Sequence, residues 1–179
     1  MDSFIEEVLY THEEIVARCD ELGKRISVDY KGRPLVLVGL LRGSVPFMSE
    51  LMMHIKNDLQ IDFMDVCSYH GTTSSGSVTI LKDIKTDIKD RDVIICEDIV
   101  DTGLTLKNVM ELLRERGASS IEIACLLNKP AARKYKCLEP KYVAFTVDPK
   151  FVVGFGLDYN QLYRNLDYVG VLKRSVYEK

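Results

Sequence analysis

The chain has 179 residues, enough for one domain with a full hydrophobic core, and carries a formal net charge of −3 at pH 7. This charge argues against a general nucleic-acid binder, although it leaves room for a local basic site. No apolar run approaches the ~20 residues that a membrane-spanning helix needs, and the first residues lack the basic and apolar regions of a signal peptide.

The five cysteines are odd in number and widely spaced, and no two of them form a CxxC pair. A zinc site and a disulfide framework are therefore not expected. Free thiols of this kind favour a reducing compartment, so the sequence predicts a cytoplasmic protein.

The first predicted elements are a helix, a strand and a second helix. Thr11 and Glu14 have the spacing of a capping box, and apolar residues then follow at helical spacing as far as Ile26. Residues 35–40 are continuously apolar, as in a buried strand of a parallel sheet. Pro46 suits the first turn of the second helix.

Arg42 and Gly43 lie between this strand and the second helix. Ligands of open α/β sheets bind at the carboxyl ends of the strands, so these two residues are candidates for ligand binding. The glycine would let a ligand approach the main chain closely. The alternative is a solvated arginine in an ordinary turn.

A long strand is predicted at residues 59–69 and overlaps a small, polar, glycine-containing stretch at 68–77. Few apolar side chains anchor this stretch, so we expect a mobile loop. A plain hairpin connection is the alternative. The chain returns as a strand at 78–81, and residues 82–91 are expected to be a solvated connection.

The stretch around which the chain is organised begins with a buried strand at residues 93–96. Three carboxylates follow in a predicted loop, and then a predicted helix begins. The candidate binding residues of this stretch are Glu97, Asp98, Asp101, Thr102, Gly103, Leu104 and Thr105. Main-chain N–H groups at such a helix start can bind a phosphate, whereas carboxylates can bind ribose hydroxyls or Mg²⁺. Carboxylates at a helix start are often only caps, but that alternative accounts poorly for three acids together.

The rest of the chain continues the alternation of strands and helices. Gly117 is expected to end the third helix, and a buried strand at 121–127 is followed by Lys129. A lone lysine after a strand is usually a surface residue. Further strands are predicted at 142–147 and 168–172.

One helical turn is predicted between the last two strands, at residues 159–164. The order of elements predicts an α/β fold, with a doubly wound, mainly parallel sheet flanked by helices. Residues 1–179 are expected to form a single domain. The N-terminal residues and about 148–179 would form a small hood over the sheet.

Two stretches of the chain resemble a known family. Residues 93–106 are similar to the phosphoribosyl diphosphate motif of the type I phosphoribosyltransferases. Lys129 and residues 148–160 resemble the branch of that family that uses hypoxanthine and guanine, and the likeness covers nearly the whole chain. It implies a purine salvage enzyme that transfers the 5-phosphoribosyl group from phosphoribosyl diphosphate (PRPP) to hypoxanthine, and also to guanine. The products would be IMP or GMP and pyrophosphate.

The resemblance also implies roles for the candidate residues. Asp101 would be the catalytic base near N7 of the purine. The 5′-phosphate and ribose would be bound by Glu97, Asp98, Asp101, Thr102, Gly103, Leu104 and Thr105. The purine would be bound by Lys129, Phe151, Val152 and Asp158. The cofactor would be Mg²⁺, held by Glu97, Asp98 and Asp158.

Pyrophosphate would be bound, by the same resemblance, by Arg42, Gly43 and Arg164. The family binds it beside a non-proline cis peptide, here between Leu41 and Arg42. Many relatives have lysine where this chain has Arg42. A planar guanidinium group, which can bind bidentately, thus replaces a compact ammonium group. The resemblance also implies a lid at residues 68–77, which includes Ser68 and Tyr69.

The expected partners are PRPP and a 6-oxopurine base, without nucleic acid or membrane, and the family resemblance implies a homodimer or homotetramer. Two alternatives stay open. One is a nucleotide-sensing regulator on the same fold, which would be expected to have a basic surface and a degraded catalytic loop. The other is a phosphoribosyltransferase for another base, such as adenine or orotate. The preference between hypoxanthine and guanine, and the use of xanthine, are not determined by the sequence.

Overall fold

The structure is a computed structural model that describes residues 2–68, 78–135 and 138–178. In chain order its elements are β1 (Ile5–Tyr10), α1 (His12–Asp29), β2 (Leu35–Leu40), α2 (Ser44–His54), β3 (Leu59–Ser68), β4 (Val78–Lys82), β5 (Asp92–Val100), α3 (Leu104–Glu115), β6 (Ser120–Asn128), the 3-10 turn η1 (Pro130–Ala132), β7 (Tyr142–Thr146), β8 (Val152–Val153), β9 (Val169–Leu172) and α4 (Arg174–Tyr177). Of the expected lid, Ser68 ends β3, whereas residues 69–77, with Tyr69, lie outside the described residues.

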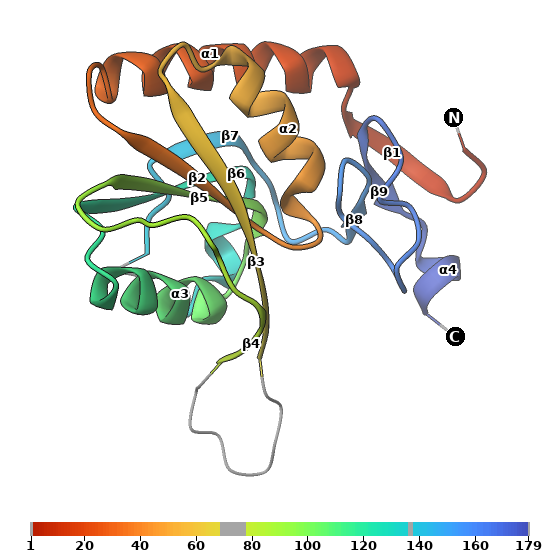
Figure 1. The fold of residues 1–179 in the computed structure, drawn as a ribbon. Coiled ribbons are helices and arrows are strands. Elements are labelled where there is room, and N and C mark those ends of the chain that lie inside the picture. The colour runs from red at the N-terminus through yellow and green to blue at the C-terminus, as the bar shows by residue number, and fades with distance from the viewer. Residues whose placement is uncertain (1, 69–77, 136–137, 179) are drawn as a thin grey trace.

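The main sheet has the strand order β4-β3-β2-β5-β6-β7. Four of its five strand pairings are parallel, and β4 pairs antiparallel with β3 at one edge. Helices α1 and α2 cover one face of the sheet and α3 covers the other (Figure 1). This arrangement confirms the predicted doubly wound α/β fold.

Strand β2 shows why its sequence is continuously apolar. Leu35 and Leu37 pack into the core beneath α1 and α2, whereas Val36 and Val38 pack beneath α3. A strand covered on both faces has no solvent side, so it lacks the alternation of an amphipathic strand.

The two predicted helix ends that depend on single residues are confirmed. The Thr11 side chain accepts from the Glu14 amide at 3.3 Å, and the Glu14 carboxylate accepts from the Thr11 amide at 2.8 Å, which completes the capping box. Gly117 follows α3 with φ +85°, a conformation that favours glycine. None of the helices in the described part of the chain combines the length and the apolar character needed to cross a bilayer.

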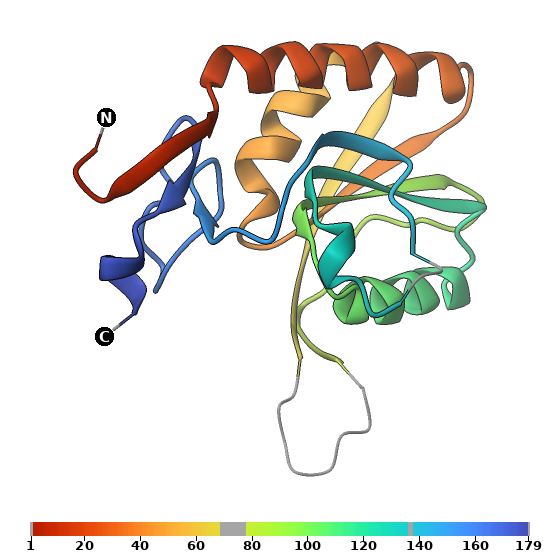
Figure 2. The ribbon, with the colours of Figure 1, turned by 180° about the vertical axis from the view of Figure 1, so that it is seen from behind.

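A second, antiparallel sheet has the order β1-β9-β8. We call this sheet, with the loop 154–168 and α4, the hood. Figures 1 and 2 both show that the hood contains both termini, and its first and last strands, β1 and β9, pair with each other. Its small core contains Ile5, Val153 and Leu172. Neither β1 nor β8 was predicted, because their order depends on pairing with β9, and only Ile5 of β1 is buried.

Two local predictions were wrong. The strand predicted at 93–96 extends to Val100, because β6 continues to pair with it as far as Asn128, so Glu97 and Asp98 lie within β5 rather than in a loop. Residues 159–164 form no helical turn. They form a tight loop in which Asn160, Gln161 and Tyr163 have positive φ.

Candidate active site

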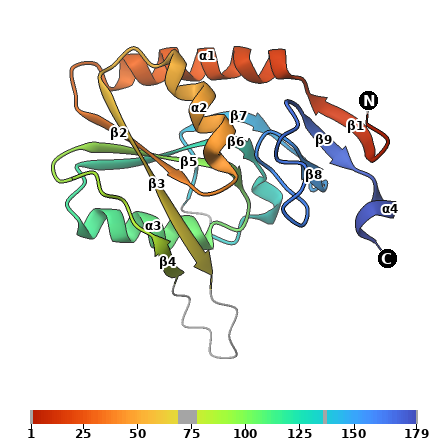
Figure 3. The same cartoon turned by 45° about the vertical axis from the view of Figure 1, so that its right-hand side comes forward.

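The candidate residues gather at the carboxyl ends of β2, β5 and β6, next to the hood. Figure 3 shows the hood beside the turn from β2 into α2. The contact is close, because a Cβ atom on Gly156 would lie 1.9 Å from the Gly43 carbonyl oxygen. Gly156 has φ +100°, so glycine suits this position for two reasons.

The loop after β5 encloses a small cavity of about 110 Å³. The residues that line it are Glu97, Ile99, Asp101, Thr102, Gly103, Thr105 and Leu106. Gly103 immediately precedes α3 and has φ +85°. The cavity therefore lies at the start of a helix, where main-chain N–H groups and the helix dipole favour a phosphate.

Arg133 ties this loop to β6 and to the segment that follows it. Its Nε donates to the Asp101 carbonyl at 3.0 Å, and its Nη2 donates to the Val100 carbonyl at 3.3 Å. The same guanidinium group also donates to the Asn128 side chain and to the Leu138 carbonyl. No role was predicted for Arg133, and nothing in its local sequence indicates one.

Glu97 and Asp98 face different parts of the site, as neighbours on a strand do. Glu97 lines the cavity, whereas Asp98 lies against Gly43, where an added Cβ would be 1.6 Å from the Asp98 Oδ2. Burial and the charge of Asp98 raise the pKa of Glu97. Burial also raises the pKa of Asp98, although the Ile99 amide and the Arg164 guanidinium favour its charged form. The site thus contains two desolvated carboxyls that a cation would stabilise.

Asp101 follows β5 directly. Its main-chain carbonyl accepts from Arg133, but its Oδ1 is buried and has no hydrogen-bond partner among the described residues. A buried polar atom without a partner costs free energy, so this oxygen would gain from a hydrogen bond donated by a ligand.

A polar cluster joins the β2–α2 turn to the hood. Arg164 donates to the Gly156 carbonyl at 2.7 Å and forms an ion pair with Asp158 at 2.8 Å. Gln161 accepts from Arg164 at 3.0 Å and from Arg42 at 3.4 Å. The Leu41–Arg42 peptide is cis, as the resemblance implies. Gln161 was missed in the sequence, because its position depends on a loop conformation that the helical spacing concealed.

The residues expected to bind the purine come from β6 and the start of β8. Lys129 donates through Nζ to the Lys150 carbonyl at 3.5 Å, which brings it next to Phe151. Val152 is buried in β8, whereas the Phe151 side chain is 40% exposed and so is open to a ligand. The Tyr177 ring stacks on the Phe151 ring, with centroids 4.7 Å apart and planes inclined by 22°. Tyr177 was not among the predicted site residues.

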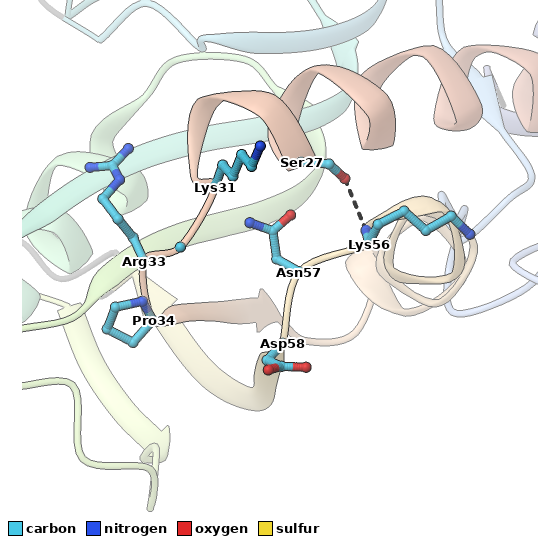
Figure 4. Close-up of a pocket in the computed structure, with 8 residues that line it drawn as sticks. Ser27, Lys31, Arg33, Pro34, Lys56, Asn57 and Asp58 are labelled. Atoms are coloured by element: carbon cyan, nitrogen blue, oxygen red, sulfur yellow. Dashed lines mark hydrogen bonds between the residues drawn. The ribbon is translucent and has the colours of Figure 1, made fainter.

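A larger hollow, of about 590 Å³, lies at the other end of the main sheet, near the starts of β2 and β3. Figure 4 shows that its basic side chains, Lys31, Arg33 and Lys56, point in different directions. The Ser27 hydroxyl there accepts from the Lys56 amide at 2.9 Å. None of the predicted site residues lines this hollow, so its size does not make it the active site.

Comparisons with known proteins identify the family of the chain. The profile of the phosphoribosyl transferase domain matches residues 7–160. A hypoxanthine-guanine phosphoribosyltransferase of Streptococcus mutans is 53% identical over 180 residues, which cover 100% of this chain and 99% of that protein.

Solved structures give the same result. A hypoxanthine phosphoribosyltransferase of Staphylococcus aureus matches with a TM-score of 0.94 and 52% identity, covering 98% of this chain and 96% of that one. A hypoxanthine phosphoribosyl transferase of Trypanosoma cruzi matches with a TM-score of 0.93 at 38% identity, covering 99% and 96% of the two chains. The chain therefore belongs to the phosphoribosyltransferase family, and within it to the hypoxanthine-guanine phosphoribosyltransferases.

Proposed function

We propose that the protein transfers the 5-phosphoribosyl group from PRPP to hypoxanthine and to guanine. In this reaction the bond from the ribose anomeric carbon to pyrophosphate breaks, a bond to a purine nitrogen forms, and the purine loses one proton. The observation that carries the proposal is the buried Oδ1 of Asp101, which has no hydrogen-bond partner among the described residues and belongs to a residue that lines the small cavity. It would provide a proton acceptor next to the space for the phosphate.

The phosphoribosyl end of PRPP fits the loop after β5. We assign the 5′-phosphate to the cavity at the start of α3. The residues that would bind it are Asp101, Thr102, Gly103, Leu104 and Thr105. The ribose hydroxyls would lie against Glu97 and Asp98, whose ionised oxygens accept hydrogen bonds. Because the loop is held by main-chain contacts to β6 and Arg133, it can orient the sugar before the reaction.

The pyrophosphate would lie between the Gly43 turn and the hood. Arg42 and Arg164 are the cations at this position, and guanidinium groups bind phosphate oxygens bidentately. Their charge would stabilise the leaving group as the anomeric carbon becomes positive.

The donor set suits Mg²⁺ bound together with a diphosphate. The described residues contain no cluster of three or more metal-ligating side chains, so they make no all-protein metal cage. Mg²⁺ usually uses one or two carboxylates together with substrate phosphates and water. Asp98 and Asp158, near enough for the charge of Asp158 to raise the pKa of Asp98, fit that role, and Glu97 would assist from the ribose side. When bound, Mg²⁺ would neutralise charge on the diphosphate.

Lys129 would select the base. Its ammonium group donates hydrogen bonds and accepts none, so it matches the 6-oxo group of hypoxanthine or guanine. Adenine presents hydrogens at that position and would leave the ammonium unpaired. Phe151 would stack on the purine ring, and main-chain carbonyls near Val152 and Asp158 would accept from the 2-amino group of guanine.

We further propose a homodimer or homotetramer that acts in the cytoplasm on these small substrates. The net charge of −3 supports small-molecule substrates over nucleic acid. The free thiols of Cys19, Cys67, Cys96 and Cys125 support a reducing compartment.

The test is a substrate panel with purified protein, PRPP and Mg²⁺, in which pyrophosphate release is measured with each purine base and with orotate. Rapid turnover of hypoxanthine and guanine is expected. Adenine should be slower by ~10⁴-fold, because the site would leave a charged donor unpaired. Excess chelator should abolish turnover, and Mg²⁺ or Mn²⁺ should restore it. Equal use of adenine, or full activity in chelator, would contradict the proposal.

A further inference from the structure

Gln161 lies in the hood loop between Asp158 and Arg164, and its single side-chain oxygen contacts two guanidinium groups. It accepts from Arg164 Nη2 at 3.0 Å and from Arg42 Nη1 at 3.4 Å. Arg42 belongs to the turn after β2 and Arg164 belongs to the hood. One neutral amide therefore links the main sheet to the hood at the point where two cations meet.

Sharing one acceptor brings the two positive charges close together. The two donor nitrogens cannot be farther apart than the sum of their distances to that oxygen. Like charges at this range repel each other. The usual way to hold two arginines together is a carboxylate, which binds and neutralises them at once. An amide oxygen accepts the same hydrogen bonds but carries no net charge.

The main chain at Gln161 is fixed by its neighbour. Its amide donates to the Asp158 Oδ2 at 2.8 Å, and its φ is +66°. Arg164 is fixed in turn by Asp158 and by the Gly156 carbonyl. Arg42 is exposed and meets the hood through Gln161. The Gln161 side chain thus holds Arg42, which has fewer contacts, next to Arg164, which has more.

We propose that Gln161 is a positioning residue for the pyrophosphate end of the substrate. It holds Arg42 and Arg164 together around a diphosphate without adding a second negative charge to that of Asp158, which already pairs with Arg164. This inference rests on the proposed function, which assigns the two arginines to pyrophosphate.

Two variants distinguish the loss of the hydrogen bonds to the two arginines from the neutralisation of their charge. Gln161→Met keeps the length of the side chain but removes the acceptor, and should raise the KM for PRPP by about tenfold, the effect of losing charge-assisted hydrogen bonds. Gln161→Glu keeps the acceptor but adds a negative charge, and should raise that KM further. The excess over the Met variant should shrink at high salt, where exposed charges are screened. The KM for hypoxanthine should stay within about twofold in both, because each site contact to the base is retained.

Gln60→Glu is the matched control, because the exposed Gln60 side chain accepts from Arg91 at the opposite end of the main sheet. It makes the same chemical change beside an arginine and should leave both KM values unchanged. Binding of inorganic pyrophosphate in the presence of Mg²⁺, measured by titration calorimetry, gives a readout besides activity. Its dissociation constant should follow the KM for PRPP across the variants.

Each outcome of these measurements either supports or overturns the proposed role of Gln161. A Glu variant that binds pyrophosphate as well as the wild type would show that neutrality at this position is irrelevant, and would overturn the proposal. So would an unchanged Met variant, or an equal rise in both KM values, which would indicate a general loss of loop structure. Should the Met or Glu variant not fold, Gln161→Asn, whose side chain tolerates positive φ, should reproduce the expected tenfold loss. If the wild type fails to convert hypoxanthine, the proposed function fails, while the pyrophosphate titration still tests Gln161.

Discussion

The two halves of the active site are held in place by different means. The loop after β5 is fixed by the main sheet: the Lys129 amide donates to the Val100 carbonyl, and Arg133 donates to the carbonyls of Val100 and Asp101. The hood loop is fixed by main-chain hydrogen bonds within the hood, such as that of the Phe155 amide to the Leu166 carbonyl. Its hydrogen bond to the turn after β2 is made by side chains, from Arg42 to Gln161. The comparison teaches that the proposed phosphoribosyl side is joined to the main sheet through its main chain, whereas the proposed pyrophosphate side meets the sheet through individual side chains.

The strongest test of this comparison concerns the chemistry at the end of β5. Asp101→Asn should lower kcat by roughly 10²–10⁴-fold, the range for loss of a general base, because the amide cannot take the purine proton. PRPP binding should change much less, since the loop main chain is retained. Steady-state kinetics and PRPP titration measure the two effects. Near-normal kcat would reduce Asp101 to a helix cap.

The loop's dependence on the sheet can be broken at Arg133. Arg133→Met should lower the free energy of unfolding by about 2–4 kcal/mol, because several partly buried acceptors lose their donor. PRPP binding should weaken as well. Urea denaturation measures the stability. Arg116→Met is the control, since Arg116 pairs with Asp83 at the surface and should contribute no more than about 1 kcal/mol. Equal losses in the two variants would mean that Arg133 has no special role.

A substitution at Lys129 tests whether the proposed contact to the base acts independently of the loop after β5. Lys129→Met should lower kcat/KM for hypoxanthine by about 10–100-fold, the value of one charged hydrogen bond, and change PRPP binding little. Kinetics with each substrate varied in turn would measure the split. A parallel loss of PRPP binding would contradict the separation of the two halves.

The smallest effect is expected at the edge of the base site. Tyr177→Ala should raise the KM for hypoxanthine by about 2–10-fold, the value of one aromatic pair, because Phe151 loses the ring stacked on it. Tyr177→Phe should restore the wild-type KM, since stacking needs no hydroxyl. A lower KM in the Ala variant would instead mean that Tyr177 competes with the purine for the face of Phe151.

The difference between the two halves also explains which predictions succeeded. The main sheet was predictable because strands buried on both faces, such as β2, have continuously apolar sequences. The helix ends at Thr11 and Gly117 were predictable because caps and positive φ depend on single residue types. The turn at 159–164 was wrong because its conformation is set by contacts to Asp158 and by neighbours across the hood, which spacing along the chain does not contain.

The sequence by itself determined the alternation of strands and helices, the acidic and hydroxyl-rich stretch after β5, and the resemblance of two motifs to one family. These features depend on residues that are close together in the sequence, so they can be predicted from it. Only the tertiary structure decided that Glu97 and Asp98 face different parts of the site, that Arg133 holds the phosphate loop, and that Gln161 joins two arginines. Each of these depends on chain segments brought together across the sheet or between sheet and hood, because hydrogen bonds and desolvation act between neighbours in space.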